Sequence, residues 1–314
     1  MADYRLLIDG ALVAGDAVMD VINPATEEVL AQCPRGSERQ LDAAVAAAKA
    51  AFPGWARTPV AERKAMLNKL ADAIDANADE LARLLTQEQG KPLPEANAEI
   101  LYTSVFIRHF TSYETHDKVI EDSAERRIVQ QRKPLGVVGA IIPWNFPVLI
   151  VAFKMPLALI AGNTMVIKPS PTTPLTTLRL GELMAQIFPK GVLNIVTGDG
   201  DPVGVALVRH PKVRMSSLTG DVATGREVMK AAAETNLKRV HLELGGKAPV
   251  IVLPDADLEL TVQKIVEGGY CNSGQDCMAA SRVYAAGEIH DDFVGALVPA
   301  VKALSVGGPD SDMG

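Results

Sequence analysis

The chain has 314 residues, a formal net charge of −7 and 48% hydrophobic residues. This length and hydrophobic content allow two domains with a large core, and they exclude a disordered chain or a coiled coil. The acidic balance, without a cluster of Lys and Arg, argues against nucleic acid or an anionic membrane as the main partner. A small-molecule ligand fits the composition better.

The longest apolar stretch, residues 148–160, is interrupted by a lysine and a proline and is too short to span a membrane. The first residues lack the basic start and apolar body of a secretory signal, so a cytoplasmic protein is expected. The cysteines Cys33, Cys271 and Cys277 are too few for a disulfide framework and lack the grouped spacing of a zinc site. We expect reduced thiols and no metal.

Residues 38–110 are predicted to be helical, because Ala and Leu recur among Glu, Lys and Arg at helical spacing. The dipeptide at 53–54 (Pro-Gly) and the tripeptide at 90–92 (Gly-Lys-Pro) are expected to interrupt these helices. Residues 113–133 are polar and strand-like, which is typical of an exposed hairpin.

From residue 134 onward, short β-rich runs alternate with helical stretches. The runs cover 136–142, 164–167, 192–196 and 214–218. This repeated βα pattern predicts a parallel sheet with helices on its faces, a Rossmann-like α/β fold. Ligands of such sheets bind beyond the carboxyl ends of the strands. The segments that follow predicted strands at this edge are 143–145, 168–170 and 219–221.

Two glycine-rich turns between strand and helix, at 197–204 and 218–226, are candidates for binding a phosphate. Helix N-termini offer unpaired N–H groups and a partial positive charge, which suit a dinucleotide pyrophosphate. Taken alone, each turn is weak evidence, because glycine turns of this kind are common.

The block LELGGK at 242–247 carries Glu243, and the block GQDC at 274–277 ends in Cys277. A cysteine that attacks a carbonyl needs a partner that moves protons or activates water, and a carboxylate can fill that role. The alternative is that Cys277 is a small buried residue and Glu243 a solvated charge. The glycines beside both residues let the backbone approach a ligand closely, which favours the catalytic interpretation.

The LELGGK block and the block GGYCNSGQDC at 268–277 resemble, in this order, the two active-site signatures of the aldehyde dehydrogenase superfamily. The resemblance extends back through KPS at 168–170 and PWNFP at 143–147 to NPAT at 23–26. Residues 213–220 and 270–277 look most like the aminobutyraldehyde dehydrogenases. Family members continue well beyond residue 314, so the resemblance implies an N-terminal portion with an incomplete catalytic domain.

The resemblance also implies a division of the chain. A dinucleotide-binding domain would comprise residues 1–112 and 134–245, with an oligomerisation hairpin at 113–133 and the start of an α/β catalytic domain at 246–314. In the family such a hairpin pairs subunits, so a homo-oligomer, either a dimer or a tetramer, is expected. An ordinary exposed hairpin would look the same in the sequence.

The activity implied by the resemblance is oxidation of an aldehyde with NAD or NADP. Cys277 is the expected nucleophile, and Glu243 would activate the water that hydrolyses the resulting thioester. Asn145 would donate from its side-chain amide to the oxyanion. Lys154 would influence proton transfer near the thiol; the alternative is a surface charge. Cys271 lies in the same loop and is expected to be a packed thiol.

The cofactor residues implied by the resemblance lie at the predicted strand ends. Lys168 resembles the residue that contacts the adenosine ribose. Pro171 stands where many NAD-using relatives have a glutamate, and without that carboxylate NADP stays open beside NAD. Asp221 replaces a small hydroxyl residue and is expected to turn from the pyrophosphate and cap the next helix. The expected cofactor residues are Pro143, Trp144, Lys168, Ser170, Gly200, Gly204, Thr219, Gly220, Asp221, Leu244 and Gly245.

Phe146, Phe153 and Asp276 are expected to line the substrate pocket. Asp276 would attract a cationic amino group and repel a carboxylate, which favours an aminoaldehyde such as 4-aminobutyraldehyde. The two phenylalanines would equally accept neutral aliphatic or aromatic aldehydes. The alternative function is that of a catalytically inactive dinucleotide-binding or partner-binding fragment.

Overall fold

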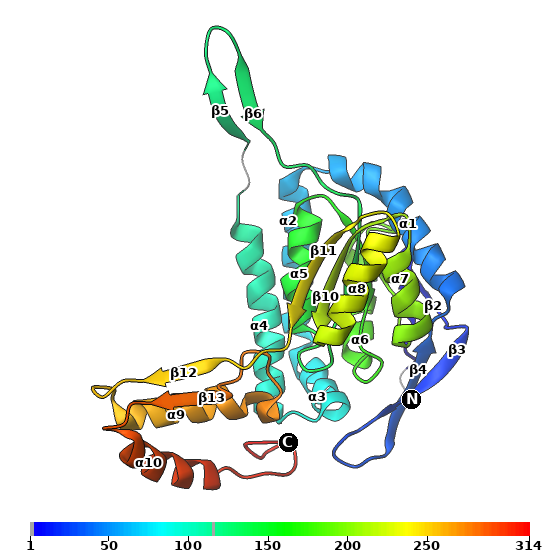
Figure 1. Ribbon diagram of the computed structural model, residues 1–314. Helices are drawn as coiled ribbons and strands as arrows, with labels where there is room; N and C mark the ends of the chain where they lie inside the picture. Colours follow the sequence, from blue (N-terminus) through cyan, green and yellow to red (C-terminus); the bar gives the residue numbers. More distant parts are fainter. Residues whose placement is uncertain (1–2, 115–116) are drawn as a thin grey trace.

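The computed structural model describes residues 3–114 and 117–314; residues 1–2 of the predicted first domain and residues 115–116 of the predicted hairpin lie outside it. A seven-stranded sheet with the order β11-β10-β7-β8-β9-β1-β2 forms the centre (Figure 1). Five neighbouring strands are parallel: β7 (Val137–Ile141), β8 (Thr164–Lys168), β9 (Leu193–Ile195), β10 (Val213–Gly220) and β11 (Arg239–Leu244). The predicted parallel sheet is confirmed. Strand β1 (Leu6–Ile8), antiparallel to β9, and the edge strand β2 (Ala11–Val13), antiparallel to β1, were not predicted.

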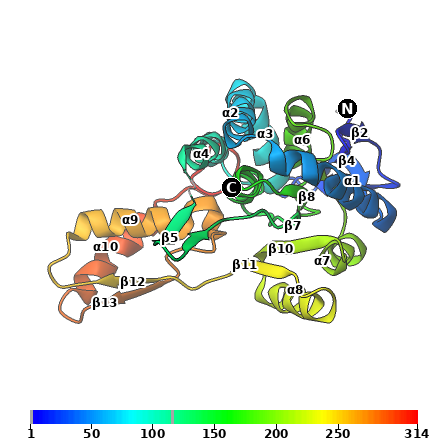
Figure 2. The ribbon, with the colours of Figure 1, turned by 90° about the horizontal axis from the view of Figure 1, so that it is seen from above.

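Helices cover both faces of this sheet (Figure 2). One face carries α1 (Glu38–Arg57), α7 (Val205–Arg209) and α8 (Val222–Glu234). The other carries α5 (Leu149–Ile160) and α6 (Leu175–Ile187), with α2 (Val60–Ala76), α3 (Ala78–Gln89) and α4 (Leu93–Ser112) packed outside them. Successive strand side chains point to opposite faces. Val137 therefore belongs to the core under α1, and Val138 to the core under α5.

The predicted interruption at 53–54 is wrong, because α1 continues through Pro53 to Arg57. A proline inside a helix removes one backbone hydrogen bond. The last turn is nevertheless held by tertiary packing: Trp55 is 2% exposed, and its ring meets Phe188 edge-on with centroids 6.3 Å apart. The interruption at 90–92 is confirmed, since Gly90 ends α3 with a left-handed φ of 94° and α4 begins at Leu93.

Among the described residues, two hairpins extend from the body of the molecule. One pairs β3 (Ala17–Ile22) with β4 (Val29–Arg35), and the other pairs β5 (Lys118–Asp122) with β6 (Arg127–Gln130). The β5–β6 hairpin protrudes far from the sheet at the top of Figure 1. The expected hairpin is thus present in the described part of 113–133, and its role in subunit pairing stays a prediction.

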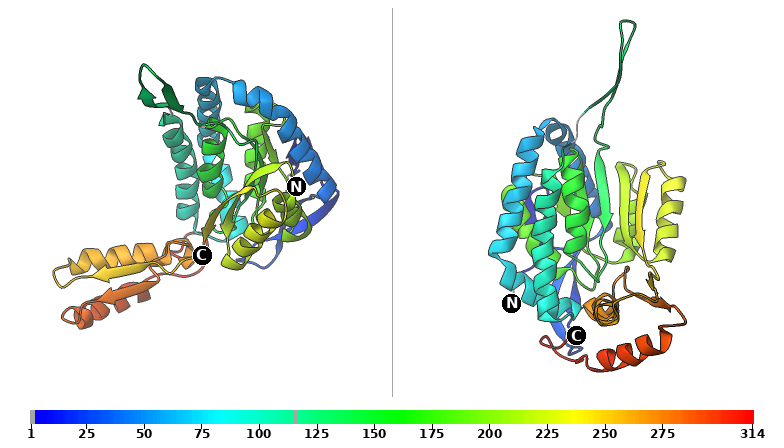
Figure 3. Two further views of the ribbon diagram at one scale, coloured as in Figure 1. Left: turned by 45° about the horizontal axis from the view of Figure 1, so that its top comes forward. Right: turned by 90° about the vertical axis from the view of Figure 1, so that its left-hand side faces the viewer.

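The C-terminal part of the chain forms a small unit beside the sheet (Figure 3). Strands β12 (Pro249–Val252) and β13 (Arg282–Ala285) are parallel, and α9 (Leu258–Tyr270) and α10 (His290–Lys302) pack together beside them. Their shared core contains Val252, Val262, Ile265 and Phe293. The short turn η2 (Cys271–Gly274) and the residues after it bring this unit back to the edge of the large sheet.

Candidate active site

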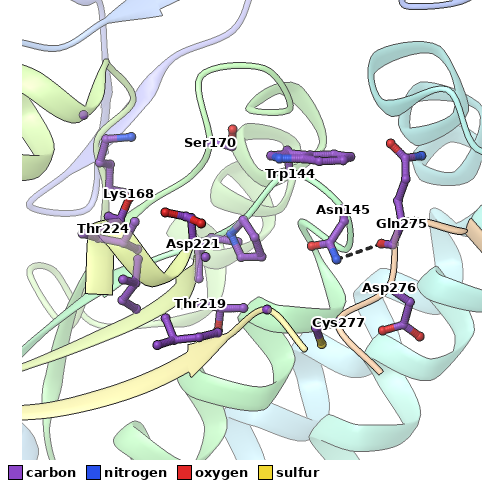
Figure 4. Close-up of a pocket in the computed structure, with 18 of the residues that line it drawn as sticks. Trp144, Asn145, Lys168, Ser170, Thr219, Asp221, Thr224, Gln275, Asp276 and Cys277 are labelled. Atoms are coloured by element: carbon purple, nitrogen blue, oxygen red, sulfur yellow. Dashed lines mark hydrogen bonds between the residues drawn. The ribbon is translucent and has the colours of Figure 1, made fainter. Parts of the chain in front are cut away.

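The carboxyl ends of the parallel strands border a cavity of about 500 Å³. Segments that follow β7, β8, β10 and β11 line it, and the loop after η2 closes one end (Figure 4). The sequence-predicted residues that line this first cavity are Pro143, Trp144, Asn145, Lys168, Ser170, Gly200, Thr219, Gly220, Asp221, Leu244, Gly245, Asp276 and Cys277. Pro171, Thr224, Gly274 and Gln275 also line it. The segments expected to bind a ligand thus gather at the predicted edge of the sheet, and the binding itself stays a prediction.

A second cavity, of about 600 Å³, lies between α4, α5 and β11. It contains the predicted residues Phe146, Phe153, Lys154, Glu243, Asp276 and Cys277. Tyr102 and His241, which the sequence analysis did not select, lie in the same wall. Thr219, Asp276 and Cys277 line both cavities, so the Cys277 thiol lies where the two cavities meet.

The loop that carries Cys277 begins with three residues in the left-handed region: Asn272, Ser273 and Gly274 have φ angles of 55°, 57° and 75°. Asparagine and glycine adopt this conformation more readily than other residues. Asn272 is buried, and its side-chain amide donates to the carbonyl oxygens of Asn145 (2.9 Å) and Gln275 (3.1 Å). The left-handed turn at 272–274 therefore holds the Cys277 loop against the segment that carries Asn145.

The Asn145 side chain is tied to the same loop. Its Nδ2 donates to the carbonyl oxygen of Gln275 at 3.0 Å, two residues before Cys277 (Figure 4). An amide nitrogen carries two N–H bonds. The second N–H is the donor that stabilisation of an oxyanion would require.

The pKa of the Cys277 thiol is raised above its ordinary value. Partial burial is the main cause, followed by the negative charge of Asp276, a hydrogen bond to Asp276 and the more distant charge of Glu243. Each of these disfavours the thiolate. The nucleophile therefore needs a proton acceptor or a bound positive charge before it can react at neutral pH.

Lys154 is buried, so the alternative of a surface charge is wrong. Its Nζ donates to Ser217 Oγ at 2.8 Å, and burial lowers its pKa to about 8, an effect that Glu243 partly opposes. Ser217 Oγ lies 3.1 Å from His241 Nδ1, and His241 Nε2 lies 3.4 Å from Glu243 Oε1. A polar row thus connects Lys154 to Glu243. The alternation of side chains along β11 places His241 and Glu243 on one face and was the signal available in the sequence.

Lys168 lies at the other end of the first cavity and is buried. Its Nζ donates to the carbonyl oxygen of Pro169 at 3.0 Å, and burial lowers its pKa to about 8, partly opposed by Asp199. With Gly200 and Gly204 it also lines a smaller cavity of about 160 Å³ between α7 and α8. The turn Gly200–Gly204 (η1) therefore contributes to the wall of this end of the cleft.

The first cavity borders the start of α8 and a buried hydroxyl group. Asp221 caps α8 by accepting a hydrogen bond from Ala223 N at 2.7 Å, which confirms the predicted cap. Thr219 Oγ1 is buried and has no hydrogen-bond partner among the described residues, although it borders both cavities. A buried hydroxyl without a partner is unfavourable, so this atom is suited to meet a polar group of a ligand.

The expectation that Cys271 is a packed thiol is wrong. The residue is exposed and lines the second cavity, because it follows the end of α9 just before the left-handed turn. Its pKa is raised to about 11, mainly by partial burial and then by Glu95. In the described ranges, 3–114 and 117–314, no group of three His, Cys, Asp or Glu side chains is arranged to hold a metal. The helices of the same ranges include none with the length and hydrophobicity of a membrane span.

A mainly parallel sheet covered by helices, with both signatures beside the cavities at its carboxyl edge, defines an α/β protein of the aldehyde dehydrogenase type. The chain belongs to the aldehyde dehydrogenase family, whose model matches residues 12–314.

The sequence is 41% identical to lactaldehyde dehydrogenase of Escherichia coli, over 98% of this chain and 65% of that protein. It is also 41% identical to mitochondrial succinate-semialdehyde dehydrogenase of Arabidopsis thaliana, over 91% of this chain and 55% of that protein. The NAD+ complex of a Bacillus cereus aldehyde dehydrogenase superposes with a TM-score of 0.96 at 37% identity, over 100% of this chain and 66% of that chain. The chain therefore spans about two thirds or less of the length of these relatives. The narrower resemblance to aminobutyraldehyde dehydrogenases stays a prediction.

Proposed function

We propose that this protein oxidises an aldehyde to a carboxylic acid, with NAD or NADP as the oxidant and Cys277 as the covalent nucleophile. The observation that carries the proposal is the position of Cys277 at the junction of the two cavities. A dinucleotide in the first cavity would supply the hydride acceptor. An aldehyde in the second cavity would present its carbonyl carbon to the sulfur from the other side.

In the proposed reaction, the Cys277 thiolate adds to the carbonyl carbon and forms a thiohemiacetal. The second N–H of Asn145 Nδ2 and the Cys277 backbone N–H donate to the oxyanion. Loss of hydride from the same carbon yields a thioester. Glu243 then takes a proton from a water molecule that attacks the thioester, and the acid and the Cys277 thiol are released. Lys154, which is connected to Glu243 through Ser217 and His241, would influence the proton on the glutamate.

Support for the dinucleotide comes from the first cavity and from the relatives. The Bacillus cereus neighbour is an NAD+ complex, and its fold covers this whole chain. Lys168 and Ser170 would lie along the adenosine ribose, and the N-terminus of α8 near Thr219 and Gly220 would face the pyrophosphate. Pro171 also lines this cavity, and its own side chain carries no charge that would repel a 2′-phosphate.

Among aldehydes, we propose that those with a cationic amino group are preferred, 4-aminobutyraldehyde being an example. The second cavity contains the carboxylates of Asp276, Glu95 and Glu243 and the rings of Tyr102 and Phe153. A carboxylate and an aromatic face both attract an ammonium group. Replacement of Asp276 by Ser should lower kcat/KM for 4-aminobutyraldehyde more than for butyraldehyde. An equal loss for both aldehydes would contradict the preference.

The reaction itself is tested by separating acylation from deacylation. With aldehyde and NAD or NADP, Glu243→Gln should keep a rapid burst of reduced cofactor and lose steady-state turnover, because only hydrolysis of the thioester needs the carboxylate. Cys277→Ala should lose both. Loss of the burst in both variants would contradict the assigned roles. Binding of the dinucleotide by the wild-type protein without any burst would favour the inactive dinucleotide-binding alternative.

A further inference from the structure

We propose that three charged residues at the start of α4, namely Lys91, Glu95 and Glu99, act together as positioning residues for the oxyanion donor and the nucleophile. We call this group the α4 clamp. It rests on the proposed function, because it assigns a task to residues that would not touch the substrate carbonyl. Lys91 comes just before Pro92, the N-cap residue of α4, and Glu95 and Glu99 lie one turn apart on the same side of the helix.

Lys91 anchors the backbone of Asn145 through a hydrogen bond from its buried side chain. Its side chain is 0% exposed, and its Nζ pairs with Glu99, whose side chain is 1% exposed. The same Nζ donates to the Asn145 carbonyl oxygen at 2.9 Å and lies 4.2 Å from the centroid of the Phe146 ring. A buried ammonium with three fixed partners has little freedom to move. The backbone that carries the Asn145 amide is therefore anchored to a charge in the protein interior.

Glu99 fixes the other end of the same turn. Its Oε1 accepts hydrogen bonds from Val148 N at 3.0 Å and Leu149 N at 3.1 Å, where α5 begins. The first N–H groups of a helix lack partners within the helix, and a carboxylate there is stabilised by the helix dipole. One ion pair thus restrains the segment from residue 145 to residue 149 at both ends.

Glu95 extends the clamp to the loop of the nucleophile. Both of its carboxylate oxygens accept from Asn272 N, at 3.0 and 2.9 Å. The Asn272 side chain in turn donates to the carbonyl oxygens of Asn145 and Gln275. The Asn145 carbonyl oxygen consequently accepts from both Lys91 and Asn272, which occupies both of its lone pairs. The α4 clamp joins the Asn145 turn and the Cys277 loop at one atom.

A positioning role explains why buried charged residues, and not apolar ones, occupy the α4 clamp. A buried ion pair is costly to desolvate, and well-packed apolar residues of similar size often serve stability as well or better. In the α4 clamp, every charged group forms hydrogen bonds with backbone atoms of the two segments that carry Asn145 and Cys277. A small displacement of reacting groups is enough to slow a reaction strongly, by about 100-fold for an error of ~1 Å. The clamp sets the separation between the oxyanion donor and the sulfur.

The test uses the double variant Lys91→Met/Glu99→Gln in the whole protein. It removes both charges together, and the glutamine retains an acceptor oxygen for Val148 N and Leu149 N. The matched control is Arg63→Met. Arg63 is also a buried charge, but it lies on α2 and donates to the carbonyl oxygen of Ile160, at the end of α5 far from Asn145.

The measured quantity is the rate constant of the burst of reduced cofactor. The amplitude of the burst gives the number of active sites, so loss of folded protein does not change the rate constant. We expect the double variant to show a burst about 10- to 100-fold slower than wild type, with little change in KM for the aldehyde. Glu95→Gln should give a smaller loss, because the amide still offers one acceptor to Asn272 N. Arg63→Met should lower the melting temperature and leave the burst rate unchanged. A wild-type burst rate in the double variant, or an equal loss in Arg63→Met, overturns the proposal.

Hydrogen exchange of the backbone amides at 272–277 separates this proposal from the reaction on which it rests. The measurement needs no activity. We expect faster exchange in the double variant and unchanged exchange in Arg63→Met. A wild-type protein without any burst overturns the proposed function, whereas unchanged exchange at 272–277 in the double variant overturns the α4 clamp.

Discussion

A β-carbon at position 246 would lie 2.8 Å from the carbonyl oxygen of Cys277. The second glycine of LELGGK therefore lies directly against the backbone of the nucleophile loop, and the two signatures are in contact. Real β-carbons essentially never approach a backbone oxygen this closely, and backbone cannot yield as a flexible side chain can.

Replacing Gly246 with Ala should displace the Cys277 loop and slow the acylation burst by about 10- to 100-fold. Gly287→Ala is the matched control, since nothing lies within 4 Å of a β-carbon at position 287 and the residue lines neither cavity. The measurement is the burst rate under saturating cofactor and aldehyde. Equal burst rates in the two alanine variants would refute a steric role for Gly246.

Replacing Asp276 with Asn should make the Cys277 thiolate available at lower pH. The charge of Asp276 and its hydrogen bond raise the pKa of Cys277, so their removal lowers that pKa. Asparagine still offers an acceptor to Met278 N, which bonds Asp276 Oδ1 at 3.0 Å. The pH dependence of alkylation by iodoacetamide, measured in a Cys271→Ser background, should shift its midpoint downward. A midpoint that stays or rises would contradict the stated cause.

Replacing Pro171 with Glu should weaken the binding of NADP relative to that of NAD. A carboxylate in the first cavity would repel a 2′-phosphate, and a partly screened repulsion of about 1–2 kcal/mol corresponds to ~10-fold in affinity. The measured quantity is the ratio of the dissociation constants for NADP and NAD. Thr172→Glu is the control, because Thr172 borders a neighbouring cavity and not the first one. The same ratio in both variants would argue against a ribose site at Pro171.

Replacing Asp221 with Ser should leave the affinity for the dinucleotide nearly unchanged. Serine also caps helices, so it would preserve the bond that Ala223 N now donates to Asp221. Asp221→Ala should instead lower the free energy of unfolding by about 1 kcal/mol. Denaturant melts and cofactor titrations of both variants distinguish capping from ligand contact. A large gain in affinity for the serine variant would mean that the carboxylate opposes the pyrophosphate.

Placing charges on the β5–β6 hairpin should weaken subunit assembly. Val119, Ile120, Ile128 and Val129 are exposed on this protruding ribbon, where apolar side chains stabilise little unless another surface covers them. The variant Ile120→Asp/Ile128→Asp should lower the molar mass measured by light scattering and leave the circular dichroism spectrum unchanged. An unaltered molar mass would show that the β5–β6 hairpin is not needed for subunit assembly.

The sequence by itself determined the parallel sheet, the helices of residues 38–110 and the edge where ligands would bind. These features follow from local periodicity and from the rule that parallel strands end at one edge. The two signatures also identified the family, because the order and spacing of their glycine, glutamate and cysteine residues can be recognised without the structure. The helix cap at Asp221 was predictable for the same reason, since the bond reaches only two residues along the chain.

Only the tertiary structure decided which groups are buried and which distant segments meet. Lys91 and Asn145 are 54 positions apart, and Glu95 and Asn272 are 177 apart, so no local pattern predicts their hydrogen bonds. The same is true of the row from Lys154 to Glu243, the exposure of Cys271 and the continuation of α1 through Pro53. Burial depends on what packs against a side chain from elsewhere in the fold. The sequence gives only the identity of these side chains. The fold determines their orientation and, through burial and neighbouring charges, their pKa.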